Sequence, residues 1–105
     1  MKIVAVTACI TGIAHTYMAQ AALEKEAAKR GHEIHVETQG GMGIENELGD
    51  TEIEEADTAI LAIAIEIEGE ERFDELKNKN RVLEMDPSAI IKDPSKAFDD
   101  LEQLL

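Results

Sequence analysis

Residues Thr58–Ile65 (Thr-Ala-Ile-Leu-Ala-Ile-Ala-Ile) constrain the fold more than any other stretch of the sequence. They are apolar at successive positions, so both faces of a strand formed here must be covered by other elements. The uninterrupted apolar run, residues 59–65, has seven residues, whereas a membrane-spanning helix needs roughly 20. The segment therefore predicts a central strand with helices on both sides.

Strand and helix patterns alternate along the rest of the chain. The expected strands are Lys2–Thr7, His32–Glu37, Thr58–Ile65 and Arg81–Asp86. The expected helices are residues 14–30, a short helix capped by Asp50 or Thr51, residues 69–76, and a last helix that begins at Asp93-Pro94. This alternation predicts an α/β fold: a three-layer sandwich with a four-stranded parallel sheet flanked by helices. A length of 105 residues fits a single domain over residues 1–105.

The first expected helix is rich in alanine. Helical periodicity favours burial of the face that carries Ala14, Tyr17, Met18, Ala21, Ala22 and Ala28. Gly31 is the expected end of this helix. In the next strand, Ile34 and Val36 alternate with polar residues, which indicates a half-exposed edge strand.

The negative charge is concentrated in the middle third of the chain. The net charge is −13, and residues 44–75 contain thirteen acidic residues and one basic residue, Arg72. No basic stripe with interleaved aromatic residues is present, which excludes nucleic acid as a partner. The same balance argues against an anionic membrane surface.

Two short segments mimic processing signals. Residues 6–9 resemble a lipoprotein cleavage box, but only residues 3–6 form an apolar stretch before it, shorter than the roughly 7–15 residues a signal needs. Residues 19–21 resemble a signal-peptidase site, but they lie within an expected helix. We therefore expect a mature, soluble, cytoplasmic protein. Its single cysteine excludes an internal disulfide and suits a reducing compartment.

The segment from Cys9 to Thr16 has the composition of an anion-binding turn. It leaves a buried strand, turns at Gly12 and enters a helix, so backbone N–H groups and the helix N-terminus would face one point. That point lies at the carboxyl edge of the sheet, where α/β proteins bind ligands. We expect Cys9 to be a nucleophile that carries a phosphoryl group as phosphocysteine. The residues expected to bind its oxygens are Ile10, Thr11, Gly12, Ile13, Ala14, His15 and Thr16.

A known phosphatase loop has the form Cys-x5-Arg-Ser/Thr, whereas this segment has Cys-x5-His-Thr. The arginine that clamps phosphate and stabilises the hydrolytic transition state is replaced by His15. The pattern therefore favours holding a phosphoryl group over hydrolysing it. Two alternatives stay open: Cys9 as a small buried residue at a strand end, and His15 as a helix-terminal residue bonded to backbone.

A second glycine-rich segment, residues 38–43, is expected at the same edge. Gln39, Gly40 and Gly41 are candidate contacts there, and a flexible turn is the alternative. His32 and His35 should point to opposite faces of their strand, and we expect no metal site. Asp86-Pro87 and Asp93-Pro94 fit a strand exit and a helix cap better than a general-acid loop.

Three segments carry a family resemblance: residues 5–9 (Ala-Val-Thr-Ala-Cys), residues 11–19 (Thr-Gly-Ile-Ala-His-Thr-Tyr-Met-Ala) and residues 36–40 (Val-Glu-Thr-Gln-Gly). The sequence resembles the fructose-type enzyme IIB domain of the bacterial phosphoenolpyruvate-dependent sugar phosphotransferase system. The similarity continues through residues 43–48, Ala56-Asp57 and Arg72-Phe73, and so covers essentially the whole chain.

The resemblance implies a function and a strand order. Cys9 would take a phosphoryl group from a phosphohistidine of enzyme IIA and pass it, without a cofactor, to fructose or a related sugar held by the membrane-embedded enzyme IIC. The implied strand order is 2-1-3-4. The sequence departs from the family at Ile10, where proline is usual, and at Gly41-Met42, where Gly-Ser is common.

Two rival hypotheses remain at this point. One is a low-molecular-weight phosphatase or arsenate reductase, and the other is a regulatory phosphocysteine module. We expect a monomer. Glu66 and Glu68 follow the third expected strand and should lie near the same edge. We expect them to repel free phosphate and to restrict the site to a docked phosphoryl donor; a role in solubility alone is the alternative.

Overall fold

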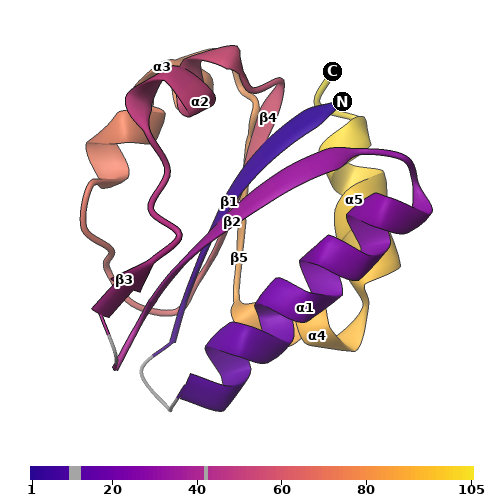
Figure 1. Cartoon of the computed structure of the whole chain (residues 1–105). Coiled ribbons are helices and arrows are strands. Elements are labelled where there is room, and N and C mark those ends of the chain that lie inside the picture. The colour runs from indigo at the N-terminus through magenta and orange to yellow at the C-terminus, as the bar shows by residue number, and fades with distance from the viewer. Residues whose placement is uncertain (10–12, 42) are drawn as a thin grey trace.

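The computed structural model describes residues 1–9, 13–41 and 43–105 (Figure 1). The strands are β1 (Lys2–Ala8), β2 (Glu33–Gly40), β3 (Gly43–Glu45), β4 (Thr58–Ile63) and β5 (Val82–Met85). The helices are α1 (Ile13–Lys29), α2 (Asp50–Glu55), the 3-10 helix η1 (Glu70–Phe73), α3 (Asp74–Asn78), α4 (Pro87–Lys92) and α5 (Pro94–Glu102).

The sheet confirms the α/β class and corrects the strand count. Over the described residues it has five strands in the order β3-β2-β1-β4-β5. β1 pairs in parallel with β2 and β4, and β4 pairs in parallel with β5, so the four expected strands stand in the implied order 2-1-3-4.

The additional strand β3 is antiparallel to β2, which makes the sheet mixed rather than wholly parallel. Gly40 pairs with Gly43 and Thr38 with Glu45, so β2 extends to Gly40 and forms a hairpin with β3. The sequence predicted a loop here because β3 has three residues, all exposed, and such a strand leaves no pattern of buried positions.

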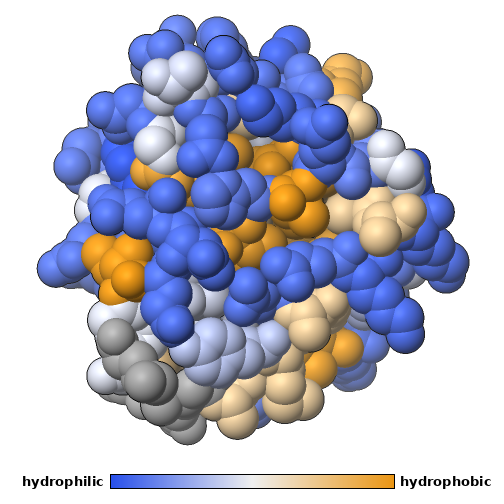
Figure 2. Space-filling view, in the orientation of Figure 1, coloured by the Kyte–Doolittle hydropathy of each residue, from blue (hydrophilic) through white to orange (hydrophobic). Residues whose placement is uncertain are grey.

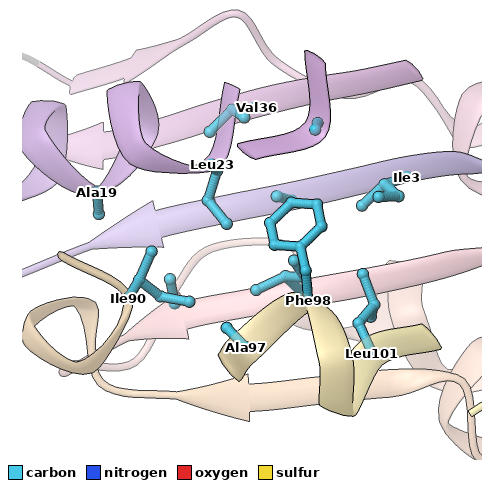
Figure 3. Close-up of a cluster of buried hydrophobic side chains, with 12 residues drawn as sticks. Ile3, Ala19, Leu23, Val36, Ile90, Ala97, Phe98 and Leu101 are labelled. Atoms are coloured by element: carbon cyan, nitrogen blue, oxygen red, sulfur yellow. The ribbon is translucent and has the colours of Figure 1, made fainter. Parts of the chain in front are cut away.

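Helices cover both faces of the sheet, as the apolar central strand predicted. In Figure 1, α1, α4 and α5 lie on one face, and α2, α3 and η1 lie on the other. The faces of β1 alternate accordingly: Ile3 and Ala5 belong to the cluster under α1 and α5, whereas Val4 and Val6 belong to the cluster under α2 and α3. Figure 3 shows the first cluster, in which Phe98 of α5 packs over the sheet beside Leu23 of α1.

Burial in α1 corrects the expected helix face. The buried positions are Thr16, Ala19, Leu23, Glu26 and Ala27, whereas Tyr17 and Met18 are exposed. Alanine occurs on all sides of this helix, so its composition does not mark the buried face. The expected end is confirmed, because α1 ends at Lys29 and Gly31, two residues later, has a left-handed φ of 74°.

Two details of the short helices also differ from the sequence prediction. The first turn of α2 is capped at Gly49, whose N–H donates to Glu52 at 3.3 Å, rather than at Asp50 or Thr51. The helix α4, between β5 and α5, was not predicted. Asp93 is confirmed as the cap of α5 and accepts from the N–H of Lys96 at 3.1 Å, and Asp86, at the exit of β5, caps α4 by accepting from the N–H of Ser88 at 2.9 Å.

The acidic middle third contains β3, the buried strand β4, the helices α2 and η1, and the start of α3. Figure 2 shows hydrophilic side chains over the α2 and α3 side of the molecule. Among the residues the structure describes, none belongs to a helix long and apolar enough to cross a membrane.

Candidate functional site at the carboxyl edge of the sheet

Cys9 lies where three parallel strands end together. It follows β1 directly, and Ala8 pairs with Gln39 of β2 on one side and Ile63 of β4 on the other. The N–H of Ala64 donates to the carbonyl of Ala8 at 3.0 Å, which extends this alignment past the end of β4. Cys9 is half-buried. This is the edge at which open α/β sheets bind ligands.

The N-terminus of α1 is directed to the same edge. The helix begins at Ile13 and continues for 17 residues, so its first N–H groups and its dipole favour an anion there. Ala14 and His15 are exposed in the first turn, and Thr16 is buried. The expected oxygen-binding residues Ile10, Thr11 and Gly12 lie outside the described residues.

Thr16 and Thr38 bring hydroxyl groups beneath this edge. Both are buried, at 1% and 2% exposed, and neither Oγ1 atom has a hydrogen-bond partner in the described part of the chain. The neighbouring Thr7 differs, because its Oγ1 donates to the carbonyl of Thr16 at 3.2 Å. A Cβ on Gly40 would lie 3.9 Å from Thr16 Oγ1, so the end of β2 closely approaches α1. Two hydroxyl groups are therefore available to a ligand or to a rearranged loop.

His15 lies toward the turn between β5 and α4. Its charge contributes to lowering the pKa of Asp86, although the hydroxyl and N–H of Ser88 have the larger effect. His15 therefore lies at the carboxyl edge of the sheet, on the side of β5.

In the second glycine-rich segment, residues 38–43, the described candidate residues lie on different sides of β2. Gly40 ends β2 beside Thr16, and Gly41 is an exposed turn residue. The side chain of Gln39 points to the opposite face of β2, where its Nε2 donates to Glu37 at 2.7 Å and to the carbonyl of Glu68 at 2.9 Å. Its amide is therefore engaged with the β4–η1 connection on the α2 side of the sheet.

A buried ion pair stands next to Gln39, and sequence reasoning did not predict it. Glu37 is fully buried and faces Arg72 through two parallel contacts, each 2.9 Å long. Burial alone would raise the pKa of Glu37, but hydrogen bonds from Arg72, Gln39 and the N–H of Leu48 lower it below its ordinary value. The Glu37 carboxylate in turn raises the pKa of Arg72. One signal was available in the sequence: Arg72 is the single base among the thirteen acids of residues 44–75.

The surface around this edge combines apolar and acidic side chains. Ile44 on β3 and Ile65 after β4 are 37% and 36% exposed. The hydroxyl of Tyr17 on α1 donates to the carboxylate of Glu45 on β3, which links the helix to the added strand. Glu68 lies near the edge, as predicted, because its backbone binds Gln39.

The histidines His32 and His35 point to opposite faces, as predicted. His32 contacts Glu102 of α5 at 2.8 Å, whereas His35 contacts Glu52 of α2 and the carbonyl of Asn46. Within residues 1–9, 13–41 and 43–105, no three His, Cys, Asp or Glu side chains are grouped so as to hold a metal ion.

The fold and the edge at Cys9 define a class: an α/β domain with a candidate thiol nucleophile between the end of β1 and the start of α1. Comparison with known proteins narrows this class. The family model for the lactose/cellobiose-specific IIB subunit of the PTS system matches residues 4–100. The "PTS system fructose-like EIIB component 2" of Escherichia coli (strain K12) is 56% identical over 72 residues, which cover 69% of this chain and 68% of that protein.

Two further relatives occur as parts of longer proteins. A domain of the fructose-specific IIABC component from Borrelia burgdorferi has a crystal structure with a TM-score of 0.87 and 42% identity, covering 97% of this chain and 93% of that one. The "Fructose-like PTS system EIIBC component" of Escherichia coli (strain K12) is 51% identical over 72 residues, covering 69% of this chain and 15% of that protein. The chain belongs to the IIB subunit family of the PTS system, and the three relatives named above are fructose-like or fructose-specific components.

Proposed function

We propose that this chain is a phosphoryl carrier in which Cys9 takes a phosphoryl group from a phosphohistidine of a IIA component and delivers it to a sugar bound by a membrane IIC component. The observation that carries the proposal is the position of Cys9, half-buried between the end of β1 and the N-terminus of α1. The names of the relatives, which include IIBC and IIABC components, support a IIA donor and a IIC acceptor.

The first step forms one bond and breaks another. The Cys9 thiolate attacks phosphorus in line, the S–P bond forms, and the P–N bond to the donor histidine breaks. The electron pair of the broken P–N bond stays on the ring nitrogen, and the imidazole leaves as the neutral ring because its second nitrogen carries a proton. The first N–H groups of α1 and the hydroxyl of Thr16 would stabilise the oxygens of the phosphoryl group during transfer.

The second step returns the thiolate. A hydroxyl oxygen of the sugar attacks phosphorus, the P–O bond forms, the S–P bond breaks, and the hydroxyl proton passes to a base of the IIC component. Fructose or a related sugar is the proposed acceptor, in line with the names of the relatives. Ile10, Thr11, Gly12, Ile13, Ala14 and His15 remain proposed contacts of the phosphoryl group, with Gly40 and Gly41 forming the wall beside it.

Radioactive labelling tests the proposal. The protein is incubated with labelled phosphoenolpyruvate, enzyme I, the general phosphocarrier protein and a fructose-type IIA domain. We expect label on the wild-type chain that is stable at the pH where phosphohistidine hydrolyses, and no label on Cys9→Ser. Equal labelling of Cys9→Ser would contradict the proposal.

The same preparation separates the carrier from the phosphatase hypothesis. A phosphatase would turn over an aryl phosphate without any partner protein. We expect no turnover above that of Cys9→Ser, because a histidine stands where the clamping arginine of phosphatases would be. Turnover by the wild-type chain alone would support a hydrolase instead.

A further inference from the structure

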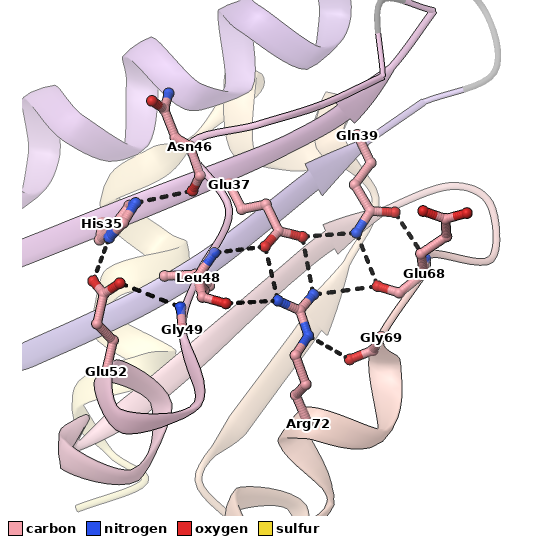
Figure 4. A network of polar contacts seen from close by, with 10 residues as sticks. All are labelled: His35, Glu37, Gln39, Asn46, Leu48, Gly49, Glu52, Glu68, Gly69 and Arg72. Atoms are coloured by element: carbon pink, nitrogen blue, oxygen red, sulfur yellow. Dashed lines mark hydrogen bonds and ion pairs between the residues drawn. The ribbon is translucent and has the colours of Figure 1, made fainter.

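The guanidinium of Arg72 binds more than the Glu37 carboxylate. Its remaining donors reach three backbone carbonyls: Leu48 at 3.1 Å, Gly69 at 2.7 Å and Glu68 at 3.2 Å (Figure 4). Leu48 belongs to the connection from β3 to α2, and Glu68 and Gly69 belong to the connection from β4 to η1. One side chain therefore ties two connections, far apart in sequence, to β2.

Gln39 completes the arrangement from the strand. Its Nε2 donates to Glu37 and to the carbonyl of Glu68, and its Oε1 accepts from the N–H of Glu68 at 2.8 Å. Glu37 also accepts from the N–H of Leu48 at 2.8 Å. We call Glu37, Gln39 and Arg72 the edge clamp. Its geometry depends on a planar fork of donors, which arginine has and lysine lacks.

The edge clamp stands beside Cys9 along the strands. Gln39 pairs with Ala8, the residue before Cys9. One connection that it holds continues directly from Ile44 and Glu45 of β3, and the other contains Ile65 and Glu66; we call these four residues the edge rim. The placement of the edge rim relative to Cys9 therefore depends on the edge clamp.

Stability alone does not account for such a buried pair. An ion pair removed from water gains little net free energy compared with well-packed apolar side chains, because desolvation offsets the attraction. What the pair supplies is a fixed geometry for two loops. The edge rim exposes two isoleucines and two glutamates, which complement a partner surface that combines apolar residues with Lys and Arg.

We propose that Glu37, Gln39 and Arg72 are positioning residues that hold the edge rim in the shape that docks the phosphohistidine-bearing donor, a protein with an apolar patch bordered by basic residues. The proposal rests on the proposed function for the identity of the donor. It assigns to the edge clamp the affinity for the donor and leaves the chemical step to Cys9 and the N-terminus of α1.

The test compares Arg72→Lys and Glu37→Gln with a matched pair elsewhere. Arg30 supplies the match, because it contacts Glu26 at 2.7 Å and Glu102 at 3.1 Å and also donates to the carbonyl of Ser95 at 3.0 Å. It lies after the C-terminus of α1, at the opposite end of that helix from Cys9. Arg30→Lys and Glu26→Gln are the controls, and circular dichroism with thermal melting identifies variants that remain folded.

The readout is single-turnover phosphorylation at increasing concentrations of a charged fructose-type IIA domain. We expect the edge-clamp variants to raise the half-saturating donor concentration by about tenfold and to leave the limiting rate within about twofold, the signature of lost binding rather than lost chemistry. The controls should leave both values unchanged while lowering the melting temperature. Arg72→Lys keeps the charge, so a wild-type value for this variant would overturn the proposal.

A binding titration keeps this proposal separate from the proposed function. Each variant is also made in the Cys9→Ser background, and its affinity for the same IIA domain is measured without phosphoryl transfer. Weaker binding with the edge-clamp variants and unchanged binding with the controls supports the edge clamp, even if Cys9 proves not to be the acceptor. Equal affinities overturn the edge clamp, even if Cys9 is phosphorylated. Absence of any binding by the parent chain overturns both.

Discussion

Thr16 retains a hydroxyl group that forms no hydrogen bond within the described residues, although it is 1% exposed. A buried hydroxyl without a partner costs about 1–3 kcal/mol, so selection for stability alone would favour valine at this position. Thr16 lies in the first turns of α1, at the edge where Cys9 follows the first strand. A phosphoryl oxygen on Cys9 would accept a hydrogen bond from this hydroxyl and so offset the free-energy cost of burying it.

Thr16 and its neighbour Thr7 should therefore respond in opposite ways to replacement by valine. Thr16→Val should keep or raise the free energy of unfolding, by about 1 kcal/mol, because it removes an unsatisfied group. It should slow phosphorylation of Cys9 by about tenfold or more, because it removes a donor to the transferred group. Denaturant unfolding and rapid-quench labelling measure the two effects.

Thr7→Val is the control for Thr16→Val. The Thr7 hydroxyl already has a partner in the carbonyl of Thr16, so its loss should lower the free energy of unfolding by about 1 kcal/mol. The labelling rate should stay within about twofold of the wild-type rate. A Thr16→Val protein that transfers at the wild-type rate would remove Thr16 from the site.

Individual residues of the site differed in how far the sequence predicted them. Cys9 and Gly12 form a local pattern, so a strand, a turn and a helix were enough to single them out. Glu37 and Arg72 are 35 positions apart, and each resembles an ordinary surface charge until the fold brings them together. The side-chain direction of Gln39 could not be predicted either, because it depends on the backbone of Glu68, 29 residues away.

At the scale of elements, Gly69 connects β4 to η1 beneath Arg72. Its φ of 72° is in the left-handed region, and a Cβ there would lie 2.5 Å from Arg72 Nε. Gly31, which ends α1, has a similar φ of 74° but open space around the added atom. A side chain at Gly31 would therefore cause backbone strain alone, whereas a side chain at Gly69 would cause backbone strain and a steric clash with Arg72.

Alanine at each position tests this difference. Gly31→Ala should lower the free energy of unfolding by about 1–2 kcal/mol, the cost of a left-handed residue with a side chain. Gly69→Ala should lower it by at least about 1 kcal/mol more, because the Arg72 side chain must move. Denaturant unfolding gives both values, and equal losses would show that Arg72 adapts freely.

The link between β2 and η1 through Glu37 also predicts a dependence on pH. The folded state lowers the pKa of Glu37 below its ordinary value of 4.5. The stability it contributes is therefore complete above pH 4.5 and is lost as the pH falls through the lower folded-state pKa. The difference in unfolding free energy between wild type and Glu37→Gln should shrink as the pH falls below that range.

Other carboxylates with lowered pKa values, among them Glu52, Asp86 and Glu102, are present in both proteins, so the difference isolates Glu37. If the difference in unfolding free energy between wild type and Glu37→Gln stayed constant from neutral pH to acid unfolding, the ionised Glu37–Arg72 pair would be contradicted. Chemical unfolding at a series of pH values is sufficient to measure it.

The sequence predicted long buried elements well and short exposed ones poorly. β4 was predicted because its residues are apolar on both faces, and α5 because Asp93-Pro94 marks its start. β3 and α4 were missed because they have three and six residues and carry little hydrophobic periodicity. The buried face of α1 was mispredicted because alanine occurs on every side and the packing of the sheet, not the composition, selects Leu23.

At the scale of the whole molecule, the negative charge is concentrated outside the segments that carry Cys9 and α1. Of the net charge of −13, residues 44–75 carry −12, since they contain thirteen acids and one base. The single base, Arg72, is paired with the buried Glu37 within the edge clamp. It therefore does not neutralise the exposed acids of α2, η1 and α3. Cys9 and α1 lie in the neutral first part of the chain, so we expect backbone dipoles and hydroxyl groups rather than Lys or Arg side chains to hold a phosphoryl group.

The excess of acids predicts a response to salt. Raising sodium chloride from about 0.05 M to about 0.5 M shortens the Debye length and screens repulsion among exposed carboxylates. The melting temperature at neutral pH should therefore rise, since repulsion within the acidic layer opposes the compact state. A melting temperature that falls with salt would indicate that attractive pairs outweigh this repulsion.

The central claim, that Cys9 carries the phosphoryl group, has a direct measurement. The chain is charged from phosphoenolpyruvate through the upstream phosphocarriers, digested under conditions that preserve the S–P bond, and analysed by tandem mass spectrometry. We expect a phosphorylated Cys9 sulfur and an unmodified His15. A phosphoryl group on His15, or on any residue other than Cys9, would contradict it.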